Sequence, residues 1–520
     1  MSIKHKIYPN LYKDSVSLMT VSAKAIAVEG IEQASVVMAS ATNLENLADA
    51  GLGTYDAHPN DLIVAVSGDD GACDEALTIV EALLTEQGSS GADDVVSDVA
   101  ASSIQMAVSR DPAVNFALIS VPGDYAAAEA MKSLRLGMDV MIFSDNVPAS
   151  QELEIKQYAD SQDLMVMGPD CGTAIVNGIP LGFANVVRRG PIGLVGASGT
   201  GTQEVTVRVH QLGSGISQAL GTGGHDLAEA IGGISMMHGL NALADDDDTE
   251  VIVLVSKPPA ESVAERMLSR AAEIDKPVVV MFLGADPASV ERPGIYAAGY
   301  LAQAADLAVA VTQGKEPVRT PIHISHRTEV ALFEARRRMA DSQRYVRGVF
   351  SGGTFCFEAQ LIAAEHGLKS NSNTPTQGND KLADLGTSVQ NTIIDMGDDE
   401  FTQGRPHPMI DPSQRDARVR KELADPTTAV VLLDVVLGYG SADDPVSELI
   451  AVIAAGRSAA KAEGRHPLII AYVCGTDRDL QGRDAVVSSL RAAGVLVAET
   501  NAEAATWASA VAAHRQGVQK

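Results

Sequence analysis

A short turn rich in glycine and hydroxyl residues, GASGTGT, starts at Gly196 and has the composition of an anion-binding loop. It follows an apolar run typical of a strand and precedes a segment typical of a helix. Glycines at a helix N-terminus leave backbone N–H groups free, and these groups bind anions with the help of the helix dipole. The residues that we expect to line this phosphate-binding loop are Gly196, Ser198, Gly199, Thr200 and Gly201. A helix cap by Thr200 or Thr202 is the alternative role of the hydroxyls.

The sequence GTGG at 221–224 ends the next apolar run and forms a second glycine-rich turn. Parallel strands of one βαβ unit end at the same edge of a sheet, so we expect Gly223 and Gly224 beside the first loop. His225 follows them and is a candidate catalytic residue, either as a phosphocarrier or as a general base. A polar surface histidine at the start of a helix is the alternative.

A related turn, SGGT, follows a later apolar run and also leads into a helix-like segment. It repeats the pattern of the first loop, and a looser copy stands at residues 64–76. We expect Ser351, Gly352, Gly353 and Thr354 to bind the substrate, for instance through a second anion. The alternative is structural, because any strand-to-helix turn favours glycine for backbone freedom and tight packing.

The segment MGPDCGT ends another predicted strand and adds three candidate substrate-binding residues. Cys171 is a candidate nucleophile, and a small buried packing residue is the alternative. Gly172 and Thr173 are expected to contact the substrate through backbone and hydroxyl groups. Lys257, which follows a further strand, is an additional candidate cation.

The loop GRPHP at 404–408 brings a cation and a titratable ring close together in the sequence. Its prolines favour an extended backbone in the residues that precede them. Arg405 and His407 are therefore candidate catalytic residues, since arginine binds carboxylate and phosphate through paired hydrogen bonds. Pairing of Arg405 with acidic surface residues such as Asp398 is the alternative.

All these loops require strands that alternate with helices, and the chain as a whole is typical of the α/β class. A length of 520 residues exceeds one hydrophobic core, and 46 glycines with only 4% aromatic residues suit parallel sheets under close-packed helices. We predict three doubly wound domains with parallel sheets, at 1–188, 189–330 and 331–520. Within the first domain we expect a strand at 16–21, a helix at 26–33 and a strand at 34–38.

The formal net charge of −28 disfavours nucleic acid and anionic membranes as partners, because both would repel the chain. The four cysteines lie far apart without ligand-like spacing, so we expect no metal site, no disulfide and a reducing compartment. The first residues lack an apolar signal, and no later apolar run is long enough to span a bilayer. We therefore expect a cytoplasmic protein that acts on small molecules.

Several longer motifs resemble known families. The segments NFALISVP, MGPDCGT, GLVGASGTGTQEV and GTGGHDL are similar, in order, to the α subunit of succinyl-CoA synthetase. The segment LLDVVLGYG is similar to the carboxy-terminal domain of its β subunit. A resemblance to the FdrA family covers nearly the whole chain and includes the motifs VSKPPAE and GRPHPMIDP. The resemblance implies a Rossmann-like, CoA-binding-type first domain and two flavodoxin-like domains, as in the synthetase without its ATP-grasp domain.

The resemblance to FdrA also implies an activity. It implies a subunit of oxamate carbamoyltransferase, which converts oxalurate and phosphate into oxamate and carbamoyl phosphate during allantoin and purine breakdown. The loop at 196–201 would then bind phosphate or carbamoyl phosphate, and no metal or other cofactor would be required. Companion subunits encoded nearby are implied, in a homo-oligomer or a hetero-oligomer.

Departures from the synthetase pattern agree with this interpretation. The region 284–299, which corresponds to the phosphohistidine loop of the synthetase, contains no histidine. The glycine-rich CoA loop of the synthetase is not recognisable near the N-terminus either, so CoA is a possible ligand but not the favoured one. The alternatives are a CoA ligase or transferase subunit and a non-catalytic scaffold subunit.

Overall fold

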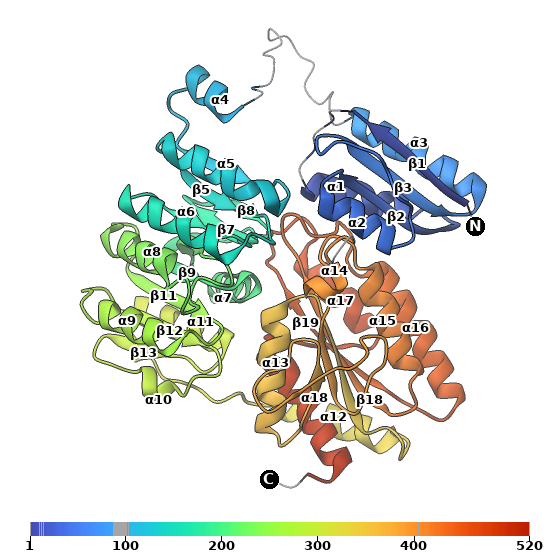
Figure 1. Ribbon diagram of the computed structural model, residues 1–520. Helices are drawn as coiled ribbons and strands as arrows, with labels where there is room; N and C mark the ends of the chain where they lie inside the picture. The colour runs from blue at the N-terminus through green and yellow to red at the C-terminus, as the bar shows by residue number, and fades with distance from the viewer. Residues whose placement is uncertain are drawn as a thin grey trace. The chain divides into compact units, whose positions relative to one another are not determined.

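The computed structural model of the protein describes residues 2–9, 11, 13, 15–86, 101, 103–402 and 405–518. The chain forms two compact units: unit 1 consists of Met1–Asp170 and Phe401–Asp411, and unit 2 of Cys171–Glu400 and Pro412–Lys520. Figure 1 shows the elements in chain order. The described strands form two three-stranded and two seven-stranded sheets.

The first sheet of unit 1 is antiparallel. Strand β3 lies in its centre and pairs antiparallel with both neighbours, in the order β1-β3-β2. The parallel sheet expected here is therefore wrong, because the third strand in the sequence inserts between the first two. The elements are β1 (Ser2–Tyr8), α1 (Ser15–Ile26), β2 (Ile31–Met38), α2 (Ala41–Asp49), β3 (Leu62–Gly68) and α3 (Asp70–Glu86).

Helix α1 occupies the segment where we expected a strand. Its residues Leu18, Val21 and Ala25 recur at helical spacing, and all three are buried in the core against the sheet. The valines of this segment suggest a strand by their intrinsic preference, but burial of one helical face decides its structure. The strand expected at 34–38 is confirmed as β2, but β2 begins at Ile31, so the helix expected at 26–33 is wrong.

The second sheet of unit 1 is parallel, in the order β4-β5-β6. Its elements are α4 (Ile104–Arg110), β4 (Phe116–Ile119), α5 (Gly123–Arg135), β5 (Asp139–Ile142), α6 (Ala149–Ser161) and β6 (Val166–Met167). The prediction of parallel strands is confirmed here. The prediction of one doubly wound sheet over 1–188 is wrong, because this segment contributes strands to three separate sheets.

The first seven-stranded sheet belongs to unit 2 and has the order β13-β12-β11-β9-β10-β7-β8. Strands β9 to β13 are parallel, as predicted, and the hairpin β7-β8 extends them in the antiparallel sense. The strands are β7 (Thr173–Val176), β8 (Ile179–Gly182), β9 (Arg189–Gly196), β10 (Ile216–Gly221), β11 (Val251–Ser256), β12 (Val278–Phe282) and β13 (Ile295–Ala297). The helices are α7 (Gly199–Gln211), α8 (Ile234–Asp245), α9 (Glu261–Ala271), α10 (Pro287–Val290) and α11 (Leu301–Thr312).

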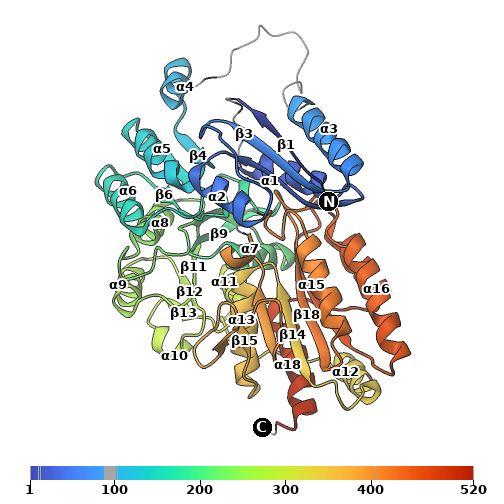
Figure 2. The ribbon, with the colours of Figure 1, turned by 45° about the vertical axis from the view of Figure 1, so that its right-hand side comes forward.

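The second seven-stranded sheet is parallel throughout, in the order β16-β15-β17-β14-β18-β19-β20. Helices α13 and α18 pack together on one side of it and α15 and α16 on the other (Figure 2). The strands are β14 (Tyr345–Phe350), β15 (Asn371–Ser372), β16 (Asp380–Lys381), β17 (Thr392–Asp395), β18 (Thr428–Val436), β19 (Leu468–Cys474) and β20 (Leu496–Ala498). The helices are α13 (Gly353–Glu365), α14 (Asp399–Thr402), α15 (Ser413–Ala424), α16 (Ser447–Ala462), α17 (Arg483–Ala492) and α18 (Asn501–Gln516).

Helix α12 (His326–Arg338) precedes this second sheet in the sequence. Its N-cap is Ser325, whose side chain accepts a hydrogen bond from the backbone N–H of Thr328. No helix in the described part of the chain is both long enough and apolar enough to cross a membrane.

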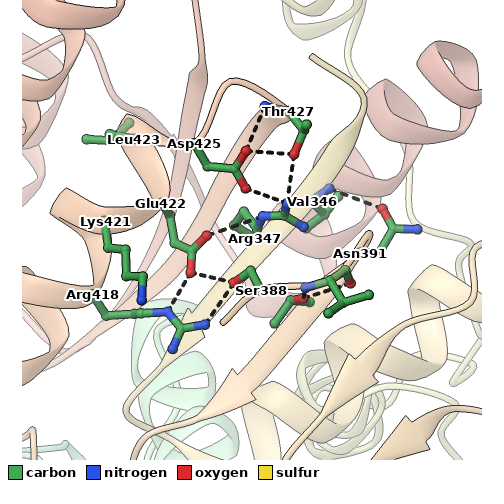
Figure 3. A network of polar contacts seen from close by, with 12 residues as sticks. Val346, Arg347, Ser388, Asn391, Arg418, Lys421, Glu422, Leu423, Asp425 and Thr427 are labelled. Carbon is green, nitrogen blue, oxygen red and sulfur yellow. Dashed lines mark hydrogen bonds and ion pairs between the residues drawn. The ribbon is translucent and has the colours of Figure 1, made fainter. Parts of the chain in front are cut away.

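A buried network of charged side chains connects helix α15 to strand β14 (Figure 3). Arg347 is 2% exposed and lies 3.2 Å from Glu422 Oε2 and 2.7 Å from Asp425 Oδ2. Arg418 donates hydrogen bonds to the other carboxylate oxygen of Glu422 and to Ser388. Removal of Arg347 would leave Glu422 with Arg418 as its one remaining cation in the described ranges and would remove the cation that pairs with Asp425, so the network favours one packing of α15 on the sheet.

Replacement of Arg347 tests this network. We expect Arg347→Met to lower the free energy of unfolding by about 3–5 kcal/mol, because Glu422 and Asp425 lose their buried partner. The matched control is Arg420→Met on the same helix, whose pair with Glu448 is exposed and is worth about 0–1 kcal/mol. If urea unfolding shows that both variants lose the same free energy of unfolding, a structural role for the network is contradicted.

Candidate functional site

Helix α7 begins at the glycine-rich turn, directly after strand β9. Ser198 is its N-cap, and the Ser198 side chain accepts a hydrogen bond from the backbone N–H of Gly201 at 3.0 Å. A cap is therefore present, but Ser198 supplies it rather than Thr200 or Thr202. A Cβ at Gly196 would lie 2.2 Å from Thr202 Oγ1, so the turn requires glycine there.

The first turn of α7 presents hydrogen-bond donors suited to an anion. None of the described residues accepts a hydrogen bond from the backbone N–H of Ser198, Gly199 or Thr200, and Gly199 is exposed. Thr173 Oγ1 lies 3.7 Å from where a Cβ on Gly199 would stand, and it is buried without a partner in the described ranges. The fold thus brings Thr173 to the predicted phosphate loop, where the helix dipole favours negative charge.

The turn at the start of helix α13 packs directly against this loop. Ser198 Oγ and Thr354 Oγ1 are 2.6 Å apart, and the backbone N–H of Thr354 donates to Thr200 Oγ1 at 3.4 Å. Both helices belong to unit 2. The two glycine-rich turns that the sequence repeats therefore form one cluster of residues, a contact that the sequence alone did not predict.

A carboxylate of the chain already occupies part of the second turn. The backbone N–H groups of Ser351 and Gly352 both donate to Asp434, at 2.7 Å to Oδ1 and 2.7 Å to Oδ2. Burial raises the pKa of Asp434, and these two hydrogen bonds oppose the rise. A second anion would have to displace Asp434, so the prediction of an anion at residues 351–354 needs revision.

Asp395 ends strand β17 beside the same turn. Its Oδ1 accepts a hydrogen bond from the backbone N–H of Gly397 at 2.9 Å, and its Oδ2 lies 2.5 Å from where a Cβ on Gly353 would stand. Burial raises the pKa of Asp395 to about 7, although the positive charge of Lys257 opposes this rise. A carboxyl group that changes its protonation near neutral pH is suited to proton transfer.

Two buried glutamates connect the helices of the two large sheets. Glu204 on α7 accepts a hydrogen bond at Oε1 from the backbone N–H of Asn501 at 3.3 Å. Glu358 on α13 accepts one at Oε1 from the backbone N–H of Leu301 at 2.8 Å. Asn501 and Leu301 are the first residues of α18 and α11, so each glutamate caps a helix that belongs to the other sheet.

These two carboxyl groups hold protons more strongly than exposed glutamates do. Burial raises the pKa of Glu358 to about 7. Burial also raises the pKa of Glu204, and the negative charge of Glu358 raises it further. The side chain of Asn501 donates to Glu358 Oε2 at 2.8 Å, so one asparagine contacts both glutamates. Because two adjacent buried charges are costly, the pair retains a proton near neutral pH.

His225 lies in an exposed turn after strand β10 and not at the start of a helix. Gly223 beside it is buried with φ at 84°, whereas Gly224 is exposed. The next helix, α8, begins only at Ile234, and the side chain of Asp226 accepts hydrogen bonds from its first turn. The catalytic role of His225 stays a prediction.

Cys171 is 2% exposed and lies under the β10 loop. Its thiol donates to the carbonyl of Thr173 at 3.6 Å, and a Cβ on Gly221 would lie 2.5 Å from its sulfur. This environment favours the packing role over a nucleophile. The carbonyl of Gly172 accepts a hydrogen bond from the backbone N–H of Phe183 at 2.8 Å, which fixes the loop.

Arg405 and His407 belong to unit 1, so a role in the cluster around α7 stays a prediction. Arg405 is exposed. His407 accepts a hydrogen bond at Nδ1 from the backbone N–H of Met409 at 3.2 Å, and burial lowers its pKa to about 4. The ring is therefore neutral at physiological pH. A neutral imidazole is suited to a general base rather than to a permanent cation.

The carboxylates Asp395, Asp434, Glu204 and Glu358 were not among the site residues predicted from the sequence. A signal was present for Asp434, which is the one acidic residue within an apolar strand, TAVVLLDVV. A charge inside a buried run requires partners, and in this structure the partners are the N–H groups of the neighbouring loop. The two glutamates share a subtler signal, because each stands six positions after its helix cap, at 198 to 204 and 352 to 358.

Three protein-family profiles match the chain. They are described as "AllF, heavy metal-associated domain" for residues 1–100, "CoA binding domain" for residues 187–284 and "CoA-ligase" for residues 349–511. The protein YahF of Escherichia coli K12 is 43% identical over 505 residues, which cover 96% of this chain and 97% of YahF. The succinate–CoA ligase α subunit of Methanothermobacter thermautotrophicus is 29% identical over 36% of this chain, which spans 63% of that subunit.

Among solved structures, the dinucleotide-forming acetyl-coenzyme A synthetase 1 of Ca. Korarchaeum cryptofilum covers 78% of this chain and 86% of its own. The sequence identity is 16% and the TM-score 0.32.

The residues of the N-terminal domain do not fit the metal that the description of its profile suggests. The one cysteine in this segment, Cys73, is buried, and its thiol donates to the carbonyl of Ser2 at 3.6 Å. The loop between β1 and α1, residues 9–14, contains no cysteine, histidine or methionine. Over the described ranges, no three His, Cys, Asp or Glu side chains are grouped as metal ligands.

The buried glutamate pair generates a pH-dependent prediction. Because the pKa of folded Glu358 is raised to about 7 from 4.5, its protonated form stabilises the fold, and that contribution is lost as pH rises through 7. We expect Glu358→Gln to gain stability relative to the wild type between pH 5 and pH 8. The Asn501 side chain can turn to accept from the new amide, because its Oδ1 has no partner in the described part of the chain.

Thermal unfolding at the two pH values measures this gain. The control is Glu334→Gln, at an exposed position on α12, which should change stability equally at both values. If the difference in thermal stability between Glu358→Gln and the wild type is the same at both pH values, the raised pKa of Glu358 is contradicted.

Proposed function

Since the chain belongs to the YahF family of succinyl-CoA-synthetase-like proteins, we propose that it is the anion-binding component of a carbamoyltransferase. The proposed reaction is the phosphorolysis of oxalurate, or of a related ureido acid, to oxamate and carbamoyl phosphate. The AllF-type N-terminal profile supports a role in allantoin breakdown. The observation that carries the proposal is the open first turn of α7, with three N–H donors and the buried hydroxyl of Thr173.

In this reaction the phosphate bound at α7 attacks the ureido carbon. A bond forms between phosphate oxygen and carbon, the bond from carbon to the oxamate nitrogen breaks, and one proton moves from the phosphate to that nitrogen. Donors at the helix N-terminus neutralise the charge of the phosphate and hold it for attack. Ser198 and Thr200 add hydroxyls to the same turn, and companion subunits would complete the site.

A second candidate is a CoA ligase or transferase subunit. The match of residues 187–284 to a CoA-binding profile favours it, because that segment includes the same glycine-rich turn. The phosphates of CoA are anions, so the same donors would bind them. Calorimetric binding of CoA and formation of a thioester with an added acid would support this candidate over carbamoyl transfer.

The proposal predicts loss of activity when hydroxyls are removed from the turn. We expect the double variant Ser198→Ala, Thr200→Val to lower turnover of carbamoyl phosphate with oxamate by roughly a hundredfold. The assay uses the purified chain alone and together with the products of the neighbouring genes. The matched control is Thr312→Val, whose hydroxyl bonds only to its own helix at the end of α11, and it should retain activity.

Two outcomes would contradict the proposal. Full activity of the double variant within an active complex would indicate a scaffold subunit whose partner performs the chemistry. If no combination turns over oxamate while other ureido acids react, oxamate is removed as the substrate.

A further inference from the structure

The two sides of the cluster around α7 differ in hydrogen-bonding character. The α7 side offers backbone N–H donors, as described above. The α13 side offers acceptors, because Asp434 has taken the N–H groups of Ser351 and Gly352 and two carboxylates, Asp434 and Asp395, line the turn. A ligand that joins the two sides therefore needs an anionic group at one end and a hydrogen-bond donor at the other.

Asp395 is the acceptor that remains available. It is 6% exposed, and its Oδ1 is held by Gly397. Its Oδ2 receives no hydrogen bond from any described residue. The carboxylate packs against Gly353, where any side chain would collide with Oδ2, so this contact requires glycine. Burial raises the pKa of this carboxyl group to about 7 and the positive charge of Lys257 opposes the rise, so the ionised acceptor is the main form above neutral pH.

A short series of contacts connects Asp395 to the phosphate loop. Gly353, which Asp395 contacts, is followed directly by Thr354, whose hydroxyl is 2.6 Å from that of Ser198. Gly352, on the other side of Gly353, would bring a Cβ within 2.9 Å of Thr200 Cγ2, so Asp395 contacts a residue whose two chain neighbours both touch the phosphate loop. A ligand that binds through its phosphate at α7 and extends along these contacts would reach Asp395.

We propose that Asp395 recognises the amino group of a carbamoyl phosphate bound at α7, and thereby selects carbamoyl over other acyl groups. This inference rests on the proposed function and adds its specificity. Acetyl phosphate has nearly the same shape but carries a methyl group in place of the amino group. It would leave Oδ2 of Asp395 buried against a methyl group without a hydrogen bond, and such a loss gives strong discrimination.

The Asp395→Asn variant reverses the hydrogen-bonding character at this point. The backbone N–H of Gly397 needs an acceptor, so the amide oxygen takes the place of Oδ1. The amide nitrogen then faces the ligand and presents a donor to another donor. We expect this variant to bind carbamoyl phosphate roughly 10- to 100-fold more weakly, with acetyl phosphate and inorganic phosphate changed by less than about threefold.

Competition binding on the full chain measures this selectivity, with carbamoyl phosphate, acetyl phosphate and inorganic phosphate as the three probes. The wild type should prefer carbamoyl phosphate to acetyl phosphate by at least about tenfold. The matched control is Asp399→Asn, which makes the same change of charge at an exposed position nearby and should keep the preference.

The outcomes separate this inference from the proposed function. Equal binding of the two acyl phosphates to the wild type, or an unchanged preference in Asp395→Asn, would overturn the role of Asp395 and leave the phosphate site standing. Failure of all three probes to bind, alone and in the assembled complex, would overturn the phosphate site and this inference with it.

Discussion

The exchange of helix caps between the two large sheets is the interaction on which the arrangement of unit 2 depends. Glu204 reaches the N-terminus of α18, Glu358 reaches that of α11, and Asn501 contacts both carboxyl groups. Each helix end has orphan N–H groups, and the first N–H of α18 and that of α11 are bonded only when the other sheet is in position. Neither sheet with its helices can therefore be completed alone.

The site is a consequence of this exchange. Because α7 and α13 are connected through their glutamates, their first turns meet, and the hydroxyls of Ser198 and Thr354 come within 2.6 Å. The two turns have similar sequences, but their backbone N–H groups differ in hydrogen bonding. The turn of α7 keeps its N–H groups available, whereas that of α13 donates two of them to Asp434. One repeated motif thus produces a donor side and an acceptor side.

The sequence was informative where a pattern is local. It predicted the parallel α/β units of the large sheets and the turns at Ser198 and Ser351, because strand, glycine and helix follow one another directly. It failed at α1, where Val21, despite its β preference, lies with Leu18 and Ala25 on the buried face of a helix. It also could not predict that the two turns meet or that Asp434 fills one of them, because both depend on contacts between residues about 80 or more positions apart.

Asp434 has a consequence for how this fold can change. A carboxylate held by two N–H groups at a helix end behaves as a ligand that is encoded in the chain. Loss of that one side chain, for example to glycine, would not only remove a group but also create a vacancy with donors already in place. Relatives with different substrates could therefore arise by a single substitution at this strand, without rebuilding the loop.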